Sequence, residues 1–319
     1  MCCLFGFVDY GHQLSRKARH RLLSVLSAAC EDRGTDATGI AYNFSGKQHI
    51  FKRPIPAHLM WYRVPLGATT VMGHTRMTTQ GSALKNENNH PFAGYAGNTR
   101  FALAHNGIIY NDSRIQKKMD LPKTKIETDS YVAVQLIEKK NSLDLNTVKF
   151  MAEAVKGTFN FTILDRANRL YMVKGNNPLC LYHFKKEGFY LYASTKPILE
   201  TALEEMGYSG LYHEEVKIQD GEILLIDSKG KFTWKAFTAP ASYSSYYVYD
   251  FWEPLKTEPT GYRKYMLEFG ETLGVPKKEL DWLHQMGYST YDIEESIFSS
   301  SYRYICLMES GYYDDMEEE

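Results

Sequence analysis

Apolar residues recur every three or four positions in four stretches of the first 240 residues. This spacing predicts amphipathic helices over residues 17–29, 128–137, 145–154 and 196–206, with Ser15 as a candidate N-cap of the first. Short apolar runs bounded by turn residues predict strands over residues 4–7, 40–44, 49–52, 71–75, 101–104, 158–164, 170–173, 179–184, 189–193 and 221–226. Because many connections between these strands have hairpin length, the pattern favours antiparallel sheets with helices outside them, an α+β fold.

The composition changes after about residue 237. Residues 239–249 are rich in Ala, Ser and Tyr, so we predict a domain over 2–237, a linker over 238–261 and a small helical extension over 262–319. Short helices are expected over residues 262–273, 277–286 and 292–298, another helix or a strand over 300–309, and a disordered acidic tail over 314–319. The extension either docks a partner or packs as a lid on the first domain, around a small core of Leu280, Trp282, Leu283, Met286, Ile293 and Ile297.

The bulk composition narrows the class of protein. The 319 residues carry a formal net charge of -1, which argues against a nucleic-acid or membrane-surface partner. No apolar run approaches the ~18 residues of a membrane span, and the start lacks the pattern of a secretory signal. The 5 cysteines are scattered without the paired spacing of a zinc site, so we expect no metal and a reducing, cytoplasmic environment.

Cys2 directly precedes the first predicted strand. If Met1 is removed, Cys2 carries a thiol and a free α-amine on one residue, and both groups can change protonation near neutral pH. The alternative is that this cysteine only packs in the core, as most cysteines near strands do.

Three further positions suggest an amino-acid site, although each has an ordinary structural alternative. Arg76 and nearby threonine hydroxyls end a predicted strand and suit a small carboxylate, but an isolated arginine usually forms a surface salt bridge. Asn106-Gly107 alone predicts a type I′ hairpin turn, yet its side-chain amide and backbone N–H could instead serve as two oxyanion donors. Asp129 could cap a helix or receive an ammonium group.

Six short motifs occur in order along the chain. They are Cys2, Arg33-Gly34-x-Asp36, Gly73-His74-Thr75-Arg76, His90-Pro91-Phe92, His105-Asn106-Gly107 and Thr128-Asp129-Ser130. Together they closely resemble the class II glutamine amidotransferases, which are glutaminase domains of the N-terminal nucleophile hydrolase superfamily. The resemblance covers roughly residues 2–237. It implies a four-layer αββα sandwich of two antiparallel sheets, to which the small helical extension is added.

The resemblance also implies roles for individual residues. Cys2 would be the nucleophile with its own α-amine as base, and Asn106 and Gly107 would form the oxyanion hole. The remaining site residues would be Arg76 and Thr79 for the substrate carboxylate, Asp129 for its ammonium group, and Arg33, Asp36, His74 and His90 in supporting positions. The implied reaction releases ammonia from the glutamine side chain through a thioester and needs no metal or organic cofactor.

The acceptor of the ammonia is left open by the sequence. About 80 residues follow the predicted domain, and they contain no phosphate-binding loop or adenylating signature. A glutaminase that supplies a separate synthase subunit and a free-standing hydrolase of γ-glutamyl amides are both compatible with this pattern. A non-catalytic scaffold that binds glutamine or a partner is the third reading. Gln80 and Tyr131 differ from residues common in the family, which leaves open whether L-glutamine itself is the substrate.

Overall fold

A computed structural model describes residues 2–238 and, further on, residues 267, 270–271, 273–288, 292–293, 296–297 and 299–315. Residues 2–238 belong to one compact unit, and the described residues from 267 onward belong to a second. The predicted linker over 238–261 lies outside the described residues except for Thr238.

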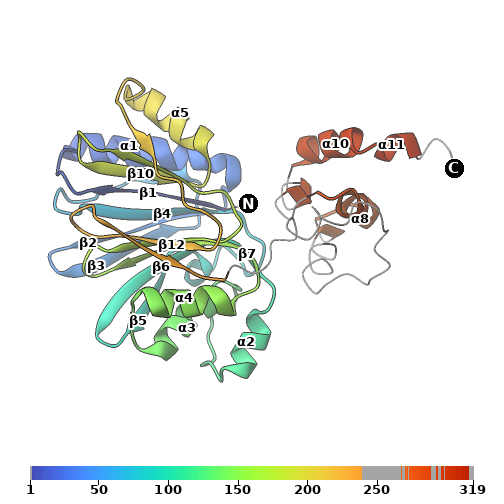
Figure 1. Ribbon diagram of the computed structural model, residues 1–319, viewed down its shortest axis with the longest axis horizontal. Coiled ribbons are helices and arrows are strands. Elements are labelled where there is room, and N and C mark those ends of the chain that lie inside the picture. The colour runs from blue at the N-terminus through green and yellow to red at the C-terminus, as the bar shows by residue number, and fades with distance from the viewer. Residues whose placement is uncertain are drawn as a thin grey trace. The chain divides into compact units, whose positions relative to one another are not determined.

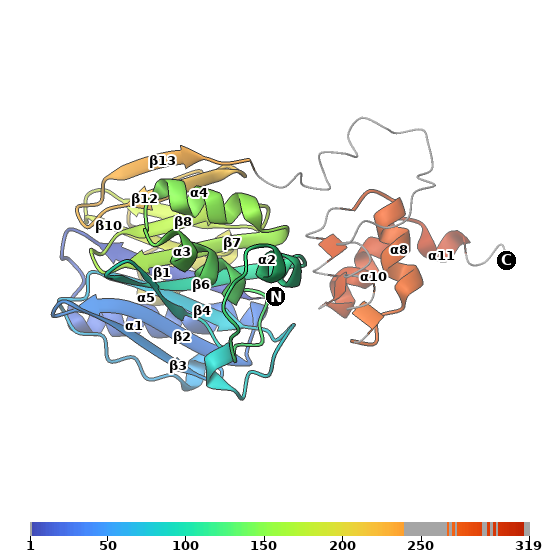
Figure 2. The ribbon, with the colours of Figure 1, turned by 90° about the horizontal axis from the view of Figure 1, so that it is seen from below.

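The first unit is built on two antiparallel sheets that pack face to face (Figures 1 and 2). The first sheet has the order β11 (Glu214–Glu215), β9 (Cys180–Phe184), β10 (Phe189–Ala193), β1 (Cys3–Asp9), β4 (Thr70–Arg76), β2 (Ala37–Phe44) and β3 (Lys47–Arg53). The second has the order β13 (Phe232–Ala236), β12 (Glu222–Ile226), β8 (Leu170–Lys174), β7 (Gly157–Asp165), β6 (Thr99–Ile109) and β5 (Phe92–Ala96).

Helices cover the outer face of each sheet (Figure 1). Helices α1 (Arg16–Ala29) and α5 (Lys196–Met206) lie on the first sheet, while α3 (Tyr131–Lys140) and α4 (Leu145–Ala154) lie on the second. Short elements complete the unit: α2 (Asp112–Lys118), η1 (Cys30–Arg33), η2 (Ala57–Leu59) and η3 (Asn86–Asn88). The order helix, sheet, sheet, helix is the predicted αββα sandwich, and the α+β prediction is confirmed.

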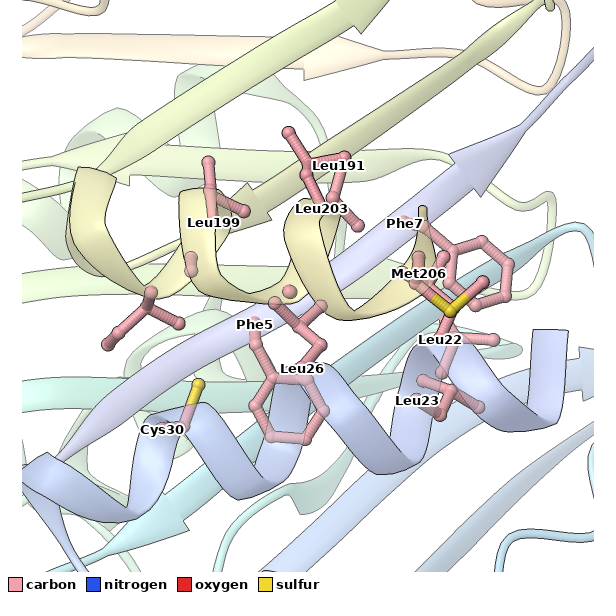
Figure 3. Packing of buried hydrophobic residues seen from close by; sticks show 14 of the residues in the cluster. Phe5, Phe7, Leu22, Leu23, Leu26, Cys30, Leu191, Leu199, Leu203 and Met206 are labelled. Carbon is pink, nitrogen blue, oxygen red and sulfur yellow. The ribbon is translucent and has the colours of Figure 1, made fainter. Parts of the chain in front are cut away.

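Strand β1 is buried along its whole length because it contacts two different cores. Phe5 and Phe7 face outward and pack against α1 and α5, as Figure 3 shows. Leu4 and Val8 face the opposite way and join the core between the two sheets. This period of two is the ordinary alternation of a strand, and it determines which way the residue at its start points.

The second unit is helical where it is described. It contains α8 (Lys277–Gln285), α10 (Ser300–Glu309) and α11 (Tyr312–Asp315), so residues 300–309 form a helix and not a strand. Of the predicted small core, Leu280, Leu283 and Ile293 are buried, whereas Met286 is exposed. The prediction of a disordered tail is wrong for residues 314–315, which belong to α11; residues 316–319 lie outside the described part. Most of the helix predicted over 262–273 also lies outside the described residues.

Most predicted helices and strands of the first unit are present within a few residues of their expected ends. Helices 145–154 and 196–206 match, and the Ser15 hydroxyl accepts a hydrogen bond from the Ala18 N–H as the predicted cap. The sequence analysis did not predict strands β5, β11 and β13 or helix α2. Strand β5 contains two alanines and a glycine, β11 has only two residues, and three of the five residues of β13 are exposed.

Candidate active site

Cys2 directly precedes β1 and faces the space between the two sheets. Leu4 pairs with His74 and Cys3 with Thr75, so the same antiparallel register brings Cys2 opposite Arg76. The Cys2 thiol is half-buried, with Sγ 3.5 Å from the carbonyl oxygen of Met77. Burial raises the pKa of this thiol, and the charge of Arg76 opposes the rise. The nucleophile candidate therefore needs a base to ionise near neutral pH.

The neighbouring Cys3 points to the other side of the strand. Its Sγ lies 3.0 Å from Sγ of Cys30, and both thiols are fully buried in the core under α1. Adjacent residues of a strand face opposite sides of the sheet. The second thiol is thus separated from Cys2 by the backbone of β1.

Arg76 is buried at the end of β4 and is held by a loop that follows it. Nη1 donates to Oδ1 of Asn89 at 2.7 Å, and Nη2 donates to the carbonyl oxygens of Gln80 at 2.6 Å and Gly81 at 3.1 Å. Since a guanidinium has five N–H donors, two remain for another acceptor. Thr79 lies half-buried in the loop between these contacts.

Arg33 and Asp36 form hydrogen bonds with the backbone of Cys2 and Arg76 and of the residues after β4. Nε of Arg33 donates to the carbonyl oxygen of Cys2 at 3.1 Å. The N–H of Asp36 donates to the carbonyl oxygen of Arg76 at 2.9 Å, and its carboxylate accepts the N–H of Thr78 at 2.7 Å. The loop after α1 is therefore tied to both β1 and β4.

Asn106 and Gly107 lie inside β6, opposite Asn160 and Phe159 of β7. The prediction of a hairpin turn at this pair is wrong, because β6 continues past it to Ile109. Gly107 has φ +141°, and a Cβ there would lie 2.0 Å from the carbonyl oxygen of Thr158. Only glycine fits this close approach of two strands.

Ser194 connects the two sheets at this point. Its Oγ accepts the N–H of Leu4 at 2.9 Å and Nδ2 of Asn106 at 3.3 Å. Nδ2 of Asn177 donates to the carbonyl oxygen of Asn106 at 2.9 Å, which fixes the backbone of that residue from the other side. Cys2 and Asn106 thus belong to different sheets. The hydroxyl of Ser194 connects them, because it is bonded to Asn106 and to Leu4, two residues after Cys2.

Asp129 is buried two residues before α3 and is bonded to β6. Oδ2 accepts the N–H of Ile109 at 2.6 Å, and Oδ1 accepts the hydroxyl of Ser130 at 3.3 Å. The N-cap of α3 is Ser130 and not Asp129. Because the carboxylate of Asp129 is bonded to β6, the alternative that it caps the helix is wrong. Burial raises the pKa of Asp129 to about 6. Its own N–H donates to Oε1 of Gln80 at 3.1 Å, which links it to the loop that holds Arg76.

The histidines of the motifs are buried between these elements and are neutral. Nε2 of His74 is hydrogen-bonded to the carbonyl oxygen of His105 at 2.9 Å, and the ring of His90 lies 4.2 Å from that of His74. Burial lowers the pKa of His74 to about 3 and that of His90 well below its usual range. Rings with such lowered pKa values are neutral near pH 7, and their packing supports the strands.

Three residues at the site were not identified from the sequence: Gln80 as a bridge, Ser194 and Asn177. Each belongs to a connection, where Ser, Asn and Gln are common, and each acts through a partner far away in the chain. These contacts can be found only once the pairing and register of the strands are known. Within the described residues, we find no group of three His, Cys, Asp or Glu side chains that could hold a metal ion. No helix in that part of the chain has the length and apolar character needed to cross a membrane.

Comparison with known proteins gives consistent matches. Residues 74–201 match the family model of the glutamine amidotransferase domain. Glutamine–fructose-6-phosphate aminotransferase (isomerizing) of Staphylococcus aureus is 30% identical over 245 residues, and the alignment covers 72% of this chain and 38% of that enzyme. The 7-cyano-7-deazaguanine synthase of Saccharolobus solfataricus is 30% identical over 189 residues, covering 56% of this chain and 39% of that protein. The chain thus spans about two fifths of the length of these curated relatives.

Solved structures give the same fold. Glutamine phosphoribosylpyrophosphate amidotransferase from B. subtilis superposes with a TM-score of 0.59 at 21% sequence identity, covering 85% of this chain and 58% of that chain. An allosteric regulatory enzyme of purine biosynthesis gives the same TM-score at 20% identity, covering 86% of this chain and 57% of that one.

Proposed function

Since the chain belongs to the class II glutamine amidotransferases, a family of enzymes, we propose that it hydrolyses the side-chain amide of glutamine through a thioester on Cys2. The observation that carries the proposal is the meeting of three groups at one end of the sandwich. Cys2 lies opposite Arg76 in the register of β1 and β4, and Asn106 of the other sheet is tied to β1 through Ser194. A nucleophile, a cation and an oxyanion donor at one place are what amide hydrolysis of an amino acid requires.

The α-amine of Cys2, exposed by removal of Met1, is the base in this proposal. Burial raises the pKa of the Cys2 thiol, so little thiolate forms at neutral pH without a base. The buried His74 and His90 have lowered pKa values and pack between strands, and neither is assigned a proton-transfer role. An amine with a pKa of about 7.7–8.0 can accept the thiol proton and later pass it to the departing ammonia.

The substrate's two charged groups are assigned to Arg76 and Asp129. Arg76 keeps two N–H donors for a carboxylate, and Thr79 lies in the loop that holds this arginine. Asp129, with a pKa of about 6, is mostly ionised at neutral pH and can receive an ammonium group. The side-chain amide would then extend toward Cys2, and the oxyanion of the tetrahedral intermediate would be stabilised by Asn106 and the N–H of Gly107. Water completes the reaction by hydrolysing the thioester to glutamate.

We further propose that the ammonia passes to a separate synthase. The matched relatives are named for transfer to fructose 6-phosphate or for synthesis of a deazaguanine, and this chain spans about two fifths of their length. By analogy with these names, the proposed acceptor of the ammonia is a synthase. A free-standing hydrolase of γ-glutamyl amides is the second candidate, since Gln80, which contacts both Arg76 and Asp129, alters the usual pattern beside the substrate.

The test is release of glutamate and ammonia from amide-labelled [¹⁵N]glutamine by the purified chain. Intact-mass spectrometry first establishes whether Met1 is absent. We expect turnover by the processed chain, none by Cys2→Ala, and full turnover by Cys180→Ala, which removes a buried thiol of the outer core from β9, the second strand beyond β1. Equal rates for Cys2→Ala and the parent chain would refute the assignment.

The same assay distinguishes the alternatives. Glutamine turnover that rises only when a candidate synthase is added supports the subunit. Turnover of γ-glutamyl amides well above that of glutamine supports the free-standing hydrolase. A chain that retains Met1 and shows no turnover of either substrate would instead fit a non-catalytic scaffold, because the proposed base would then be an amide nitrogen.

A further inference from the structure

A cavity of about 300 Å³ lies at one edge of the sandwich, between edge strand β3 of the first sheet and edge strand β5 of the second. Residues of β3, β5, β6 and the segment 86–91 line it. Cys2, Arg76, Asn106 and Asp129 do not, so the cavity is separate from the candidate active site. Its volume corresponds to about ten water molecules, at about 30 Å³ each in the liquid, which is enough for a small metabolite.

Three cationic residues line this cavity, Lys52, Arg53 and Arg100, and the side chains of Lys52 and Arg53 leave β3 on opposite faces. No aspartate or glutamate is among the lining residues. Nor is any of the three in a salt bridge within the part of the chain that the structure describes. Like charges around one small volume repel each other, and no carboxylate among the lining residues offsets that repulsion.

Arg100 shows the most direct need for a partner. Its Nε is buried, and it has no hydrogen-bond partner among the described residues. The guanidinium lies 6.0 Å from the ring of Tyr95, a contact that gives the Nε–H no acceptor. A buried donor without an acceptor costs about 1–3 kcal/mol, so an acceptor that enters the cavity would remove this cost.

Lys52 lines the same cavity, and its surroundings disfavour the charged form of its side chain. Its ammonium group donates to the carbonyl oxygen of Asn89 and lies 5.1 Å from the ring of Phe92. Burial and the nearby charge of Arg76 lower the pKa of Lys52 to about 8, while the charge of Glu87 partly opposes this. An anion in the cavity would stabilise the charged form of this lysine.

The cavity also has an apolar wall, to which Ile50, Pro91 and Ala93 contribute. A ligand with a charged head and an apolar body would fit both parts. An arginine and a lysine favour a phosphate over a single carboxylate, because a phosphate monoester carries close to two negative charges and three acceptor oxygens. The guanidinium of Arg53 lies over Phe51 at 4.9 Å, on the opposite face of β3 from Ile50 and Lys52, so Arg53 is not assigned to the phosphate.

We propose that this cavity binds a small organic phosphate, with the phosphate between Lys52 and Arg100 and the organic part against Ile50 and Pro91. No step of the proposed glutamine hydrolysis uses the cavity, so the two assignments can fail independently. Asn89 lies between the two sites, since its carbonyl oxygen accepts from Lys52 and its side chain accepts from Arg76.

The experiment is isothermal titration of the full chain with phenyl phosphate at low ionic strength, where screening is weak. Saturable binding with one site is expected. Arg100→Gln and Lys52→Met should each weaken it at least tenfold, while Arg166→Gln, which removes an exposed arginine bonded to Gly46, should leave it unchanged. Thermal melting of each variant establishes that it is folded.

Two further titrations locate the ligand and test its chemistry. Inorganic phosphate and phenol should each bind at least tenfold more weakly than phenyl phosphate, because each fills only one part of the cavity. Saturating glutamine should not displace phenyl phosphate, since the cavity is separate from the active site. The proposal is overturned by an absence of saturable binding, by equal weakening in all three variants, or by displacement with glutamine.

Discussion

Substitution of Ser194 by alanine is the sharpest test of how the site is held together. The serine is fully buried and connects two sheets through a single oxygen atom. Its Oγ accepts one hydrogen bond from the backbone N–H of Leu4 and one from the side chain of Asn106. Alanine removes this oxygen and leaves the rest of the side chain in place, so the change isolates these contacts.

The expected loss of stability in Ser194→Ala follows from the two N–H donors that are left without an acceptor. Leu4 is fully buried, so its N–H cannot turn to water, and an unsatisfied buried donor costs about 1–3 kcal/mol. The contact to Asn106 is longer, at 3.3 Å, and contributes less. A total of about 2 kcal/mol corresponds to a fall in melting temperature of roughly 4–8 °C, at about 2–4 °C per kcal/mol for a unit of this size. Because Asn106 also loses the group that orients its amide, kcat should fall about tenfold, or about 1.4 kcal/mol.

The assay combines thermal melting with steady-state glutamine hydrolysis. The control is Ser27→Ala, which removes an equally buried hydroxyl on α1 that donates to the carbonyl oxygen of Ser24. This control should lower the melting temperature less and leave kcat unchanged, because no donor is left without an acceptor there. If Ser194→Ala melted and turned over like Ser27→Ala, the proposed link between β1 and Asn106 would be wrong.

Three other changes test the site. Asn106→Ala should lower kcat about 10²–10³-fold with little change in KM, because it removes one oxyanion donor; steady-state kinetics measure this. Protonation of the Cys2 α-amine should lower kcat/KM for glutamine below about pH 8, and the fall should steepen below about pH 6, because Asp129 becomes protonated there and loses its charge; Asp129→Asn should raise KM and remove only the steepening near pH 6. Gly107→Ala should lower the melting temperature far more than Gly46→Ala, since a Cβ at Gly107 meets the Thr158 carbonyl oxygen at 2.0 Å and one at Gly46 meets no atom within 4 Å.

Most of the fold follows from patterns visible in the sequence. Helices with apolar residues at regular spacing, such as 145–154, and strands with continuous apolar runs were predicted close to their observed ends. Strand β6 was predicted too short because Asn106-Gly107 has the composition of a turn. In the folded chain this pair is kept extended by its pairing with β7, and tertiary structure overrides the local preference.

The candidate site likewise contains residues that the sequence reveals and residues that it does not. Cys2, Arg76 and Asp129 could be named from the motifs, since each has a chemical group that suits an amino-acid substrate. Their supports could not, because Ser194 acts on Leu4 across 190 positions of sequence and on Asn106 across 88. Contacts of that kind depend on strand order and register, which a single sequence does not reveal.

The hairpin tips of the sandwich all lie at the end remote from Cys2. The turn at residues 45–46 ends the strand whose other end pairs with Arg76, and the turn at 185–188 joins strands that pair near Asp9, the far end of β1. The turn at 166–169 follows Asp165, which pairs five residues before Asn106 along β6, roughly 17 Å away at about 3.4 Å per residue. A fluorophore, an affinity tag or a short peptide can therefore be grafted onto these tips, which gives a means of immobilising or tracking the protein while its chemistry stays undisturbed.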